Sequence, residues 1–463
     1  MKVLFIHPPP LGKNTYLGDI VYPPLGIAYL ASVVRKDHEV KLLDANALRI
    51  GLKEIRKIID DFSPDIVGIT STTANIFNAF EIADICKEIN KDPVVILGGI
   101  HATASTEHAL SNKNIDFTIR GEGEITFPEL LEAIENKKDF SKIKGIAYRK
   151  EGKVSITEPR PLIQDLDSIP MPAYDLLPMN KYNSVQASSG KIMTIISSRG
   201  CPYQCIFCDV QAVFGRKYRF HSPQRVCREI KHLMKNYGIK EFHFKDSEFT
   251  LLVDRTENIC DLIIKERLKI KWLCNGRVNH VNLPLLKKMK MSGCKSITYG
   301  VESGDENILK TLKKAYTLED VRRAFKSTKI AKIESTANII IGNPGDTKET
   351  IEKTIEFAKE IDADYANFNF LIPFPGTELY YMAKKNGWLL DNYRLDRIKY
   401  DICVMNATNL PTEELNKYVK KAFRNFYFRP GYILKRLGKM RWHEIKINLK
   451  GGLTLLKNSF IDS

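Results

Sequence analysis

The sequence predicts two α/β units in series, followed by a helical region. Short apolar runs alternate with helical patterns through residues 1–140 and again through residues 191–376. Continuously apolar strands that are separated by helices favour parallel sheets covered by helices. We therefore expect a doubly wound parallel-sheet domain over 1–140, a partial (βα)6 barrel over 191–376 and a helical basic C-terminal region over 377–463.

The first unit contains five expected strands and four expected helices. The strands are Val3–His7, Glu39–Asp44, Asp65–Thr70, Val94–Gly98 and Asp116–Arg120. The helices are Leu25–Val34, Leu52–Phe62, Ile76–Ile89 and Phe127–Ile134. A sheet of this kind binds its ligand at the carboxyl ends of its strands.

A linker is expected between the two units, and six strands are expected after it. Residues 141–190 combine a hairpin pattern with prolines 159, 161, 170, 172 and 178. The later strands are Met193–Ser197, Glu241–Lys245, Lys271–Asn275, Ser296–Gly300, Ser335–Ile341 and Tyr365–Leu371. In a barrel of βα units the chemistry lies at the carboxyl ends of the strands.

Composition and charge narrow the possible function classes. The chain of 463 residues is 43% hydrophobic and 27% charged, and it contains no apolar run long enough to cross a membrane. The apolar run at its N-terminus is too short for a secretory signal, so we expect a cytoplasmic protein. Of the net charge of +16, half arises after residue 420, where ten basic residues oppose two acidic ones. This basic tail either packs on the barrel or lies on an anionic membrane surface. Without a recognised module, nucleic-acid binding is not expected.

Three of the nine cysteines form the only tight cluster. Cys201, Cys205 and Cys208 follow an expected strand with Cys-x3-Cys-x2-Cys spacing. The other six (86, 227, 260, 274, 294 and 403) are scattered through apolar or helical segments, so we expect ordinary buried thiols. Thiolates suit iron–sulfur clusters or zinc. Electron-transfer clusters and structural zinc sites both use four ligands, so a trio leaves one iron of a 4Fe-4S cluster open to a substrate or cofactor. A zinc or redox thiol site is the alternative.

This spacing, with Phe207 before the last cysteine and Tyr203 within the loop, resembles the radical S-adenosylmethionine superfamily. In that family the open iron chelates S-adenosylmethionine, and reduction of the cluster releases a 5′-deoxyadenosyl radical. Later segments also resemble the family, among them FHFKDSEF at 242–249, WLCNGRVN at 272–279, YGVESG at 299–304, IGNPGDT at 341–347 and PFPGTELY at 373–380. The resemblance implies S-adenosylmethionine contacts from Glu248, Arg277, Glu302 and Asn343. Helix caps, salt bridges and tight turns would explain the same residues without a cofactor. This applies equally to Asp246 and Asn275.

The first unit resembles the cobalamin-binding domains that are fused to radical enzymes. The similar segments include HPPP at 7–10, YPPLG at 22–26, TSTT at 70–73, GGIHAT at 98–103 and GEGE at 121–124. The resemblance implies cobalamin contacts from Ser71, Thr72, Gly98, Gly99, His101 and Glu122. Small residues after strands let the backbone approach a nucleotide tail. His101 is alternatively an ordinary capped loop histidine.

The first strand departs from the motif of many corrinoid proteins. That motif, Asp-x-His-x-x-Gly, supplies a histidine to cobalt, whereas His7 has Phe5 two positions before it and Pro10 three positions after it. No residue is therefore assigned as the lower axial ligand, and loss of cobalamin binding stays open. A methylthiotransferase would need three further cysteines in this unit, which contains only Cys86.

The resemblance implies a radical S-adenosylmethionine enzyme that uses a 4Fe-4S cluster and cobalamin to modify an unactivated carbon, most often by methyl transfer. Radical oxidation or ring closure, as in anaerobic magnesium-protoporphyrin ester cyclases, is the enzymatic alternative. A corrinoid-binding or iron–sulfur sensor protein is the non-enzymatic one. The implied partners are a small-molecule, lipid or tetrapyrrole-like substrate and an electron donor such as flavodoxin or ferredoxin.

Overall fold

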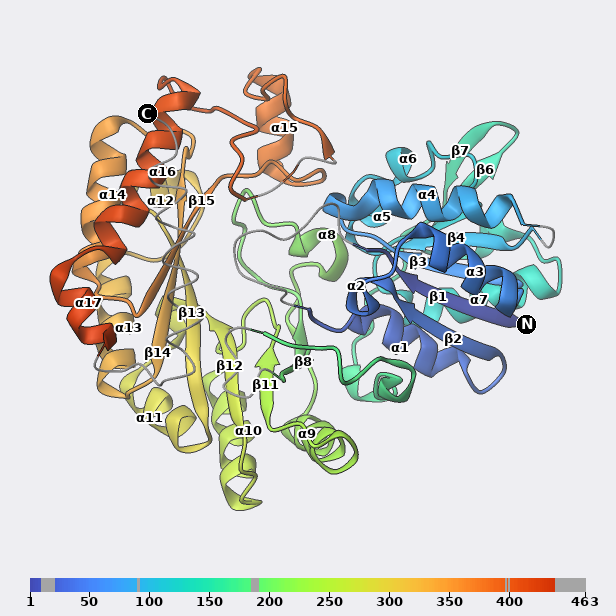
Figure 1. Cartoon of the computed structure of the whole chain (residues 1–463), viewed down its shortest axis with the longest axis horizontal. Helices are drawn as coiled ribbons and strands as arrows, with labels where there is room; N and C mark the ends of the chain where they lie inside the picture. Colours follow the sequence, from blue (N-terminus) through green and yellow to red (C-terminus); the bar gives the residue numbers. More distant parts are fainter. Residues whose placement is uncertain (10–20, 90–91, 185–190, 396–397, 399, 438–463) are drawn as a thin grey trace.

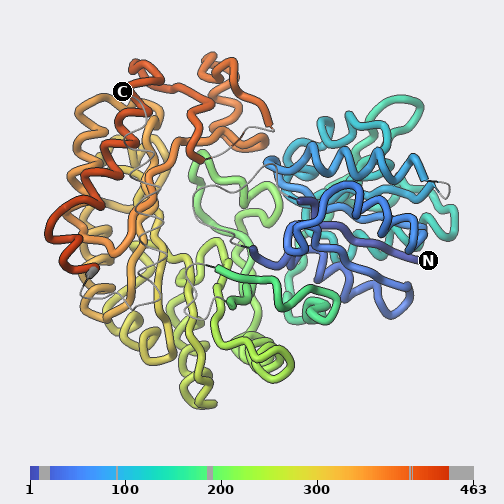
Figure 2. Tube along the Cα trace, viewed as in Figure 1, coloured from blue at the N-terminus to red at the C-terminus, as the bar shows by residue number. Residues whose placement is uncertain are grey.

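The chain folds into two α/β lobes that lie side by side, with the first lobe blue to cyan and the second green to orange (Figure 1). The computed structural model describes all residues except 10–20, 90–91, 185–190, 396–397, 399 and 438–463. Among the described residues, no helix is both long and apolar enough to cross a membrane. The two lobes correspond to the two units expected from the sequence (Figure 2).

The first lobe contains a seven-stranded sheet of order β2-β1-β3-β4-β5-β6-β7. Its strands are β1 (Lys2–His7), β2 (Glu39–Asp44), β3 (Ile66–Thr70), β4 (Val94–Gly98), β5 (Phe117–Ile119), β6 (Ile146–Lys150) and β7 (Lys153–Ile156). The first five are parallel, which confirms the doubly wound prediction. The last two pair antiparallel. The hairpin expected in the linker is therefore an extension of the first sheet.

Helices cover both faces of this sheet. They are α1 (Leu25–Val34), α2 (Ala45–Leu48), α3 (Leu52–Phe62), α4 (Ile76–Lys87), α5 (Ile100–Ala104), α6 (Thr106–Ala109) and α7 (Gly123–Glu135). Alternate residues of β1 enter two separate cores: Val3 and Phe5 pack with α1 and α7, while Leu4 and Ile6 pack with α3 and α4. With both faces filled, only the strand ends remain for a ligand.

The second lobe is an open parallel sheet of order β15-β14-β13-β12-β11-β8. Its strands are β8 (Met193–Ile195), β11 (Glu241–Phe244), β12 (Lys271–Gly276), β13 (Cys294–Glu302), β14 (Glu334–Ile341) and β15 (Tyr365–Phe370). All five neighbouring pairs are parallel, as a partial (βα)6 barrel requires. A small ribbon of β9 (Ser198–Arg199) and β10 (Arg219–Phe220) flanks its first loop.

The helices of the second lobe pack on one face of this sheet. They are α9 (Pro223–Tyr237), α10 (Val253–Lys265), α11 (Leu283–Met291), α12 (Glu306–Thr311), α13 (Leu318–Ile330) and α14 (Lys348–Glu360). The short α8 (Val210–Phe214) lies instead against α5 of the first lobe (Figure 1). Proline at the first helical position and a serine cap at Ser222 start α9. The apolar stripes of α9–α11, α13 and α14 share one core with alternate strand residues.

The region after Gly376 is less helical than the sequence predicts. It contains α15 (Glu378–Lys385), α16 (Thr412–Tyr427) and α17 (Pro430–Leu437), with no helix described between α15 and α16. Helix α16 packs on β15, and the Tyr427 hydroxyl donates to the Ala366 carbonyl at 2.7 Å. The part of the basic tail that is described thus protects an edge strand. The segment Trp442–Phe460, also expected to be amphipathic, lies outside the described residues.

Candidate functional site

The cysteine loop leaves the carboxyl end of β8 with its thiols accessible. Cys201, Cys205 and Cys208 are partly exposed, whereas the six other cysteines are buried and free, which confirms the expected division. Gly200 starts the loop at a φ of 84°, and a Cβ there would lie 2.3 Å from the Lys217 carbonyl oxygen. Only glycine tolerates both conditions, so the loop geometry is fixed by sequence.

The loop suits a multi-iron cluster better than a single metal ion. Burial raises the pKa of the Cys201 thiol and raises that of Cys208 to about 12, so bound metal would be needed to hold them as thiolates. The nearby Cys205 and Cys201 add to the raised pKa of the Cys208 thiol. An electron-transfer cluster or a structural zinc site takes four protein ligands, and this loop supplies three. The three-cysteine donor set therefore fits a cluster with one open iron.

Arg277 links this loop to the rest of the barrel mouth. Its guanidinium carbon lies 3.5 Å from the ring centroid of Tyr203 and 4.9 Å from that of Tyr316. Its terminal nitrogen donates to the Lys314 carbonyl, and its Nε donates to Asn279 Oδ1 at 3.0 Å. The guanidinium, stacked between two aromatic rings, is a rigid cation beside the cluster loop.

A buried ion pair stands at the end of β13. Glu302 Oε1 accepts from Lys314 Nζ at 3.0 Å, and each side chain is only 8% exposed. Burial lowers the pKa of Lys314, but the charges of Glu302, Tyr316 and Cys205 together outweigh it, so the net pKa is raised. Glu302 adopts a φ of 61°, in the left-handed region that non-glycine residues adopt infrequently. The sequence analysis missed Lys314, although its place twelve residues after Glu302, beside Tyr316, was a usable signal.

Glu248 is a buried carboxylate with one oxygen committed. Its Oε1 accepts from the Thr250 hydroxyl at 2.6 Å and from the Arg277 amide at 3.1 Å. Burial raises its pKa to about 7, and the charge of Glu248 raises the pKa of Cys201. Because Oε2 has no bond among the described residues, it remains available to a cationic ligand group.

The neighbouring acid, Asp246, has a structural role instead. It accepts from the Ser197 amide at 2.6 Å, from the Ser197 hydroxyl at 2.5 Å and from the Ser198 hydroxyl at 2.7 Å. These bonds end β8 two residues before the predicted end at Ser197. The helix-cap alternative for Asp246 is thus replaced by a third role, in which it fixes the start of the cysteine loop.

Asn343 leaves a buried acceptor unpaired beyond β14. Its amide nitrogen donates to the Ile340 carbonyl at 3.0 Å and to Asp346 at 3.1 Å, whereas its Oδ1 has no partner. An unmade hydrogen bond of this kind costs about 1–3 kcal/mol. A polar ligand at the barrel mouth would supply the missing donor, as the predicted S-adenosylmethionine contact requires.

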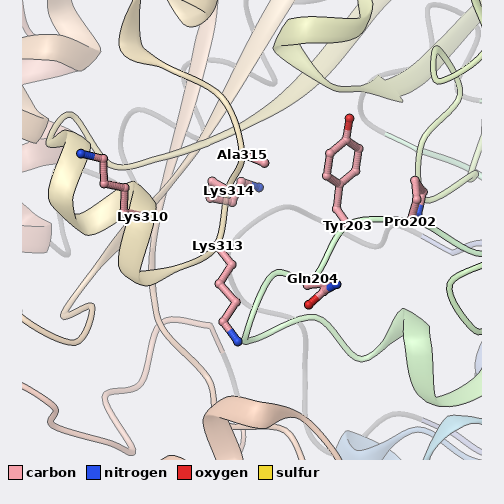
Figure 3. Close-up of a pocket in the computed structure, with 7 residues that line it drawn as sticks. All are labelled: Pro202, Tyr203, Gln204, Lys310, Lys313, Lys314 and Ala315. Carbon is pink, nitrogen blue, oxygen red and sulfur yellow. The ribbon is translucent and has the colours of Figure 1, made fainter.

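A pocket of about 450 Å³ opens beside the cysteine loop (Figure 3). Pro202, Tyr203 and Gln204 form one wall, and the other carries three lysines, which are Lys310, Lys313 and Lys314. Lys313 also pairs with Glu378 at 2.6 Å. The loop of the cluster therefore reaches the surface against a basic wall.

The carboxyl edge of the first sheet contains a glycine cradle. A Cβ at Gly98 would meet no atom within 4 Å, whereas one at Gly99 would lie 2.4 Å from the Ser71 carbonyl oxygen. Ser71 is buried and bonds back to Gly98, and Thr72 is exposed. Gly98 and Thr72 thus border open space at the end of the central strands, which fits a bulky ligand laid over the edge.

Two predicted cobalamin contacts are engaged elsewhere. His101 is fully buried, with Nδ1 on Thr73 at 3.2 Å and Nε2 on His108 at 3.0 Å. Burial lowers its pKa to about 3. Glu122 accepts from Arg199 at 3.0 Å and from Arg219 at 2.8 Å, so its carboxylate joins the two lobes. Neither side chain has a free polar atom, and we interpret both as structural residues.

His7 ends β1 at the same edge. Its Nδ1 bonds to Asp44 Oδ1 at 2.9 Å, and Asp44 also accepts from the Tyr182 hydroxyl at 2.9 Å. Asp44 therefore supplies, from the neighbouring strand, the carboxylate that the corrinoid motif places two residues before its histidine. The pairing leaves Nε2 of His7 without a partner among the described residues.

The two carboxyl edges meet at Tyr22, which precedes α1. The Tyr22 hydroxyl lies 3.4 Å from His243 Nδ1, and its ring centroid lies 4.3 Å from Lys245 Nζ. His243 belongs to β11 and Lys245 follows it. A ligand over the first sheet would therefore face a ligand in the barrel mouth.

The chain is similar to known proteins over both lobes. The B12 binding domain matches residues 19–131, and the Radical SAM superfamily matches residues 195–358. An uncharacterized methyltransferase, PH0819 of Pyrococcus horikoshii, is 40% identical over 455 residues, which cover 97% of this chain and 98% of the relative. The anaerobic magnesium-protoporphyrin IX monomethyl ester cyclase of Rubrivivax gelatinosus is 30% identical, with coverage of 94% and 78%.

Solved structures share the fold. The cobalamin-dependent S-adenosylmethionine radical enzyme OxsB matches with a TM-score of 0.76 at 18% identity, covering 99% of this chain and 72% of that one. The radical S-adenosylmethionine methyltransferase TsrM of Kitasatospora setae matches with a TM-score of 0.70 at 20% identity, with coverage of 83% and 75%.

Proposed function

The chain belongs to the radical S-adenosylmethionine enzymes that carry a cobalamin-binding domain, and we propose that it transfers a methyl group to an unactivated carbon of a small molecule. Its cofactors are a 4Fe-4S cluster, S-adenosylmethionine and cobalamin. The observation that carries the proposal is the meeting of the two carboxyl edges at Tyr22. It sets a methyl donor on the first lobe against a radical source in the second.

The relatives favour methyl transfer and keep one alternative. The relative that is 40% identical is named an uncharacterized methyltransferase, and the match covers 98% of its length. The cytidylyl-2-hydroxyethylphosphonate methyltransferase of Streptomyces wedmorensis is 29% identical. The 30% identical relative is instead a cyclase that acts on a tetrapyrrole ester. Radical oxidation or ring closure is therefore the second candidate, with the same cofactors and no transferred methyl group.

The barrel residues divide the work of binding and orientation. Cys201, Cys205 and Cys208 would hold the cluster, and the free oxygen of Glu248 would accept from the cofactor's ammonium. The Glu302–Lys314 pair presents one charge of each sign to a zwitterionic ligand. When bound, the cluster and S-adenosylmethionine supply a hydrogen-abstracting radical, and cobalamin supplies the methyl group.

Two further binding roles complete the site. The unpaired oxygen of Asn343 would accept from the adenine amino group, and Arg277 would restrain the cluster loop through its stack with Tyr203. On the first lobe, Gly98 and Thr72 would let the corrin approach the edge, and Nε2 of His7 would face it from β1. Gly99 and Ser71 would hold that edge in shape.

The environment of the reaction follows from the same surfaces. An acidic one-electron donor such as flavodoxin or ferredoxin would dock on the lysine wall of the pocket, because opposite charge steers association. A thiolate-held cluster needs a reducing compartment, so we place the enzyme in the cytoplasm. Membrane contact through the basic tail would bring it to a lipid or tetrapyrrole-like substrate.

The test is anaerobic reconstitution with iron, sulfide and cobalamin, followed by reduction in the presence of S-adenosylmethionine. The measured quantities are 5′-deoxyadenosine, S-adenosylhomocysteine and bound corrinoid. We expect all three from the wild type, and corrinoid alone from a variant with Cys201, Cys205 and Cys208 changed to alanine. A fully loaded wild-type cluster that forms no 5′-deoxyadenosine, even with candidate substrates, would instead support a sensor or binding protein.

A further inference from the structure

The inner face of the second sheet carries a polar band across its middle strands. Parallel register places Asn275, Thr298 and Thr336 side by side on β12, β13 and β14. The next level carries Asn338 beside Asn367, and their amides bond at 2.8 Å. Because side chains one residue apart point to opposite faces, these residues all share the face away from the helices.

The outer face of the same strands is apolar and filled. Its residues all belong to one buried core with the covering helices: Phe242, Phe244, Trp272, Cys274, Ile297, Tyr299, Ala337, Ile339, Ala366 and Phe368. The inner residues Asn275, Thr298 and Asn338 stay partly accessible, and Asn367 is exposed. The interior of a closed barrel is normally packed with branched apolar side chains. This inner face instead offers amides and hydroxyls to a ligand.

Lys245 places a cation at the mouth of this face. It follows His243 by two residues, so both point inward, and both contact Tyr22 of the first lobe. Among the residues that the structure describes, no acid and no hydrogen-bond acceptor pairs with its ammonium. Lys245 is an exposed residue, and partial desolvation by the surrounding protein lowers the pKa of its ammonium to about 8.

Lys245 is an accessible cation between the two cofactor edges, with no acid paired to it among the described residues. The other cations of the barrel mouth are already engaged: Lys314 pairs with Glu302, and Arg277 is stacked and bonded. Tyr22 offers only a ring face, which compensates a cation weakly. The charge of Lys245 is therefore available to an anionic group of a bound molecule.

We propose that Lys245 binds an anionic group of the substrate, a carboxylate or a phosphate, while the rest of the substrate lies against the polar band of the inner face. The identification of the bound anion as part of the substrate rests on the proposed function, whereas the anion site itself does not. The substrate class is a polar anion whose amide- or hydroxyl-binding body lies against Asn275, Thr298 and Asn338. Lys245 orients it between the two cofactors.

The experiment measures how fast an uncharged, amine-reactive acetylating reagent modifies Lys245 in the enzyme loaded with cobalamin and the cluster. Peptide mass spectrometry compares sodium pyrophosphate, sodium citrate and sodium chloride at equal ionic strength. We expect pyrophosphate or citrate to slow acetylation of Lys245 at least about fivefold, since a charge-assisted bond occupies the amine. The exposed Lys265 on α10 is the internal control and should react equally in all three salts.

The arms distinguish the possible anions and the competing explanation. Protection by pyrophosphate alone assigns a phosphate, and protection by citrate alone assigns a carboxylate. Equal rates in all three salts overturn the proposal. A Lys245 that is already unreactive in chloride, and becomes reactive when cobalamin is removed, belongs to the cofactor and also overturns it.

A second measurement uses variants and no catalysis. Phosphorus NMR line broadening of pyrophosphate should be lost in Lys245→Met, retained in Lys245→Arg and unchanged in Lys265→Met. Broadening that persists in Lys245→Met contradicts the assignment. Because neither readout requires 5′-deoxyadenosine, the anion site stands or falls separately from the radical reaction.

Discussion

The two parallel sheets of this chain are built from the same βα repeat but expose different surfaces. In the first sheet, alternate residues of each central strand enter cores on both faces, so a ligand can reach only the carboxyl edge. In the second sheet only the outer face is filled, and the inner face carries asparagines and threonines. Helices on both faces leave only the strand ends for a ligand, whereas helices on one face leave the other face of the sheet accessible as well.

The two sheets therefore suit different tasks: the first suits cofactor binding, and the second suits the reaction itself. Among the described residues, the first edge offers glycines, a hydroxyl and an imidazole but no cluster of charge. The second mouth gathers Glu248, Glu302, Arg277 and Lys314 within reach of three thiols. Charged groups that are held in fixed positions stabilise the charge that develops during a reaction.

The largest effect should come from removing the three cluster ligands. Replacing Cys201, Cys205 and Cys208 with alanine should lower 5′-deoxyadenosine formation by about 1000-fold or more, because the radical source is lost. Corrinoid binding should be unchanged, since those residues belong to the second lobe. Liquid chromatography of quenched reactions and the corrinoid absorbance measure the two. Loss of both together would show that the lobes do not function as separate binding units.

The second effect concerns the buried ion pair. Lys314→Met leaves Glu302 buried without a partner, which should cost about 3 kcal/mol of stability and about 100-fold in S-adenosylmethionine affinity. Urea unfolding and equilibrium dialysis measure the two quantities. The adjacent Lys313→Met removes only an exposed pair with Glu378 and is the matched control. Equal losses in both variants would contradict a role for the pair in binding.

A smaller effect should follow from filling the glycine cradle. Gly98→Val adds a side chain where a Cβ meets no atom within 4 Å, so the fold should persist while corrinoid affinity drops about tenfold. Gly431→Ala, on α17, also adds its Cβ to open space and serves as the control. S-adenosylmethionine cleavage should survive in both. Full corrinoid retention in Gly98→Val would move cobalamin away from this edge.

The smallest effect is on the pH dependence of stability. Burial lowers the pKa of His101, in the first lobe, and of His243, in the second, to about 3. The unfolded chain therefore binds more protons below about pH 6.5, and stability should fall as the pH drops, by about 1 kcal/mol per unit for each histidine. Glu248, with its pKa raised to about 7, acts in the opposite direction, as do the buried carboxyl groups of Asp246 and Glu229, whose pKa is also raised. His221, whose pKa burial lowers to about 4, acts in the same direction as the other two histidines.

Thermal unfolding of the apo-protein between pH 5 and pH 7 checks this balance. His101→Asn and His243→Asn should each flatten the curve, and Glu248→Gln should steepen it on the acid side. A melting temperature that rises towards pH 5 would mean that the carboxyl groups dominate instead.

The strands and the cysteine loop could be predicted from sequence, because apolar runs and ligand spacing are local properties. The limits of β2 and α1 agree with the prediction to the residue. Long-range pairing could not be read in this way. Glu122 was assigned to cobalamin from its glycine-rich surroundings, but its partners, Arg199 and Arg219, lie in the other lobe.

The same limit hid three features of the site. The partner of Glu302 is a lysine on the following loop, and the carboxylate beside His7 comes from β2 instead of the preceding residues. Lys245 was only the last residue of an expected strand, and it is the register that shows which face it shares with Asn275. The roles of the individual site residues remain predictions, each with a variant that tests it.

The most direct test of the account follows the methyl group itself. The reconstituted enzyme is reduced with S-adenosylmethionine that carries a deuterated methyl group, in the presence of a small-molecule extract of the cells that make the protein. We predict that 5′-deoxyadenosine and S-adenosylhomocysteine form together and that one extract component gains the deuterated methyl group by mass spectrometry. Formation of 5′-deoxyadenosine with a product that gains no label would contradict methyl transfer and support the cyclase-type reaction.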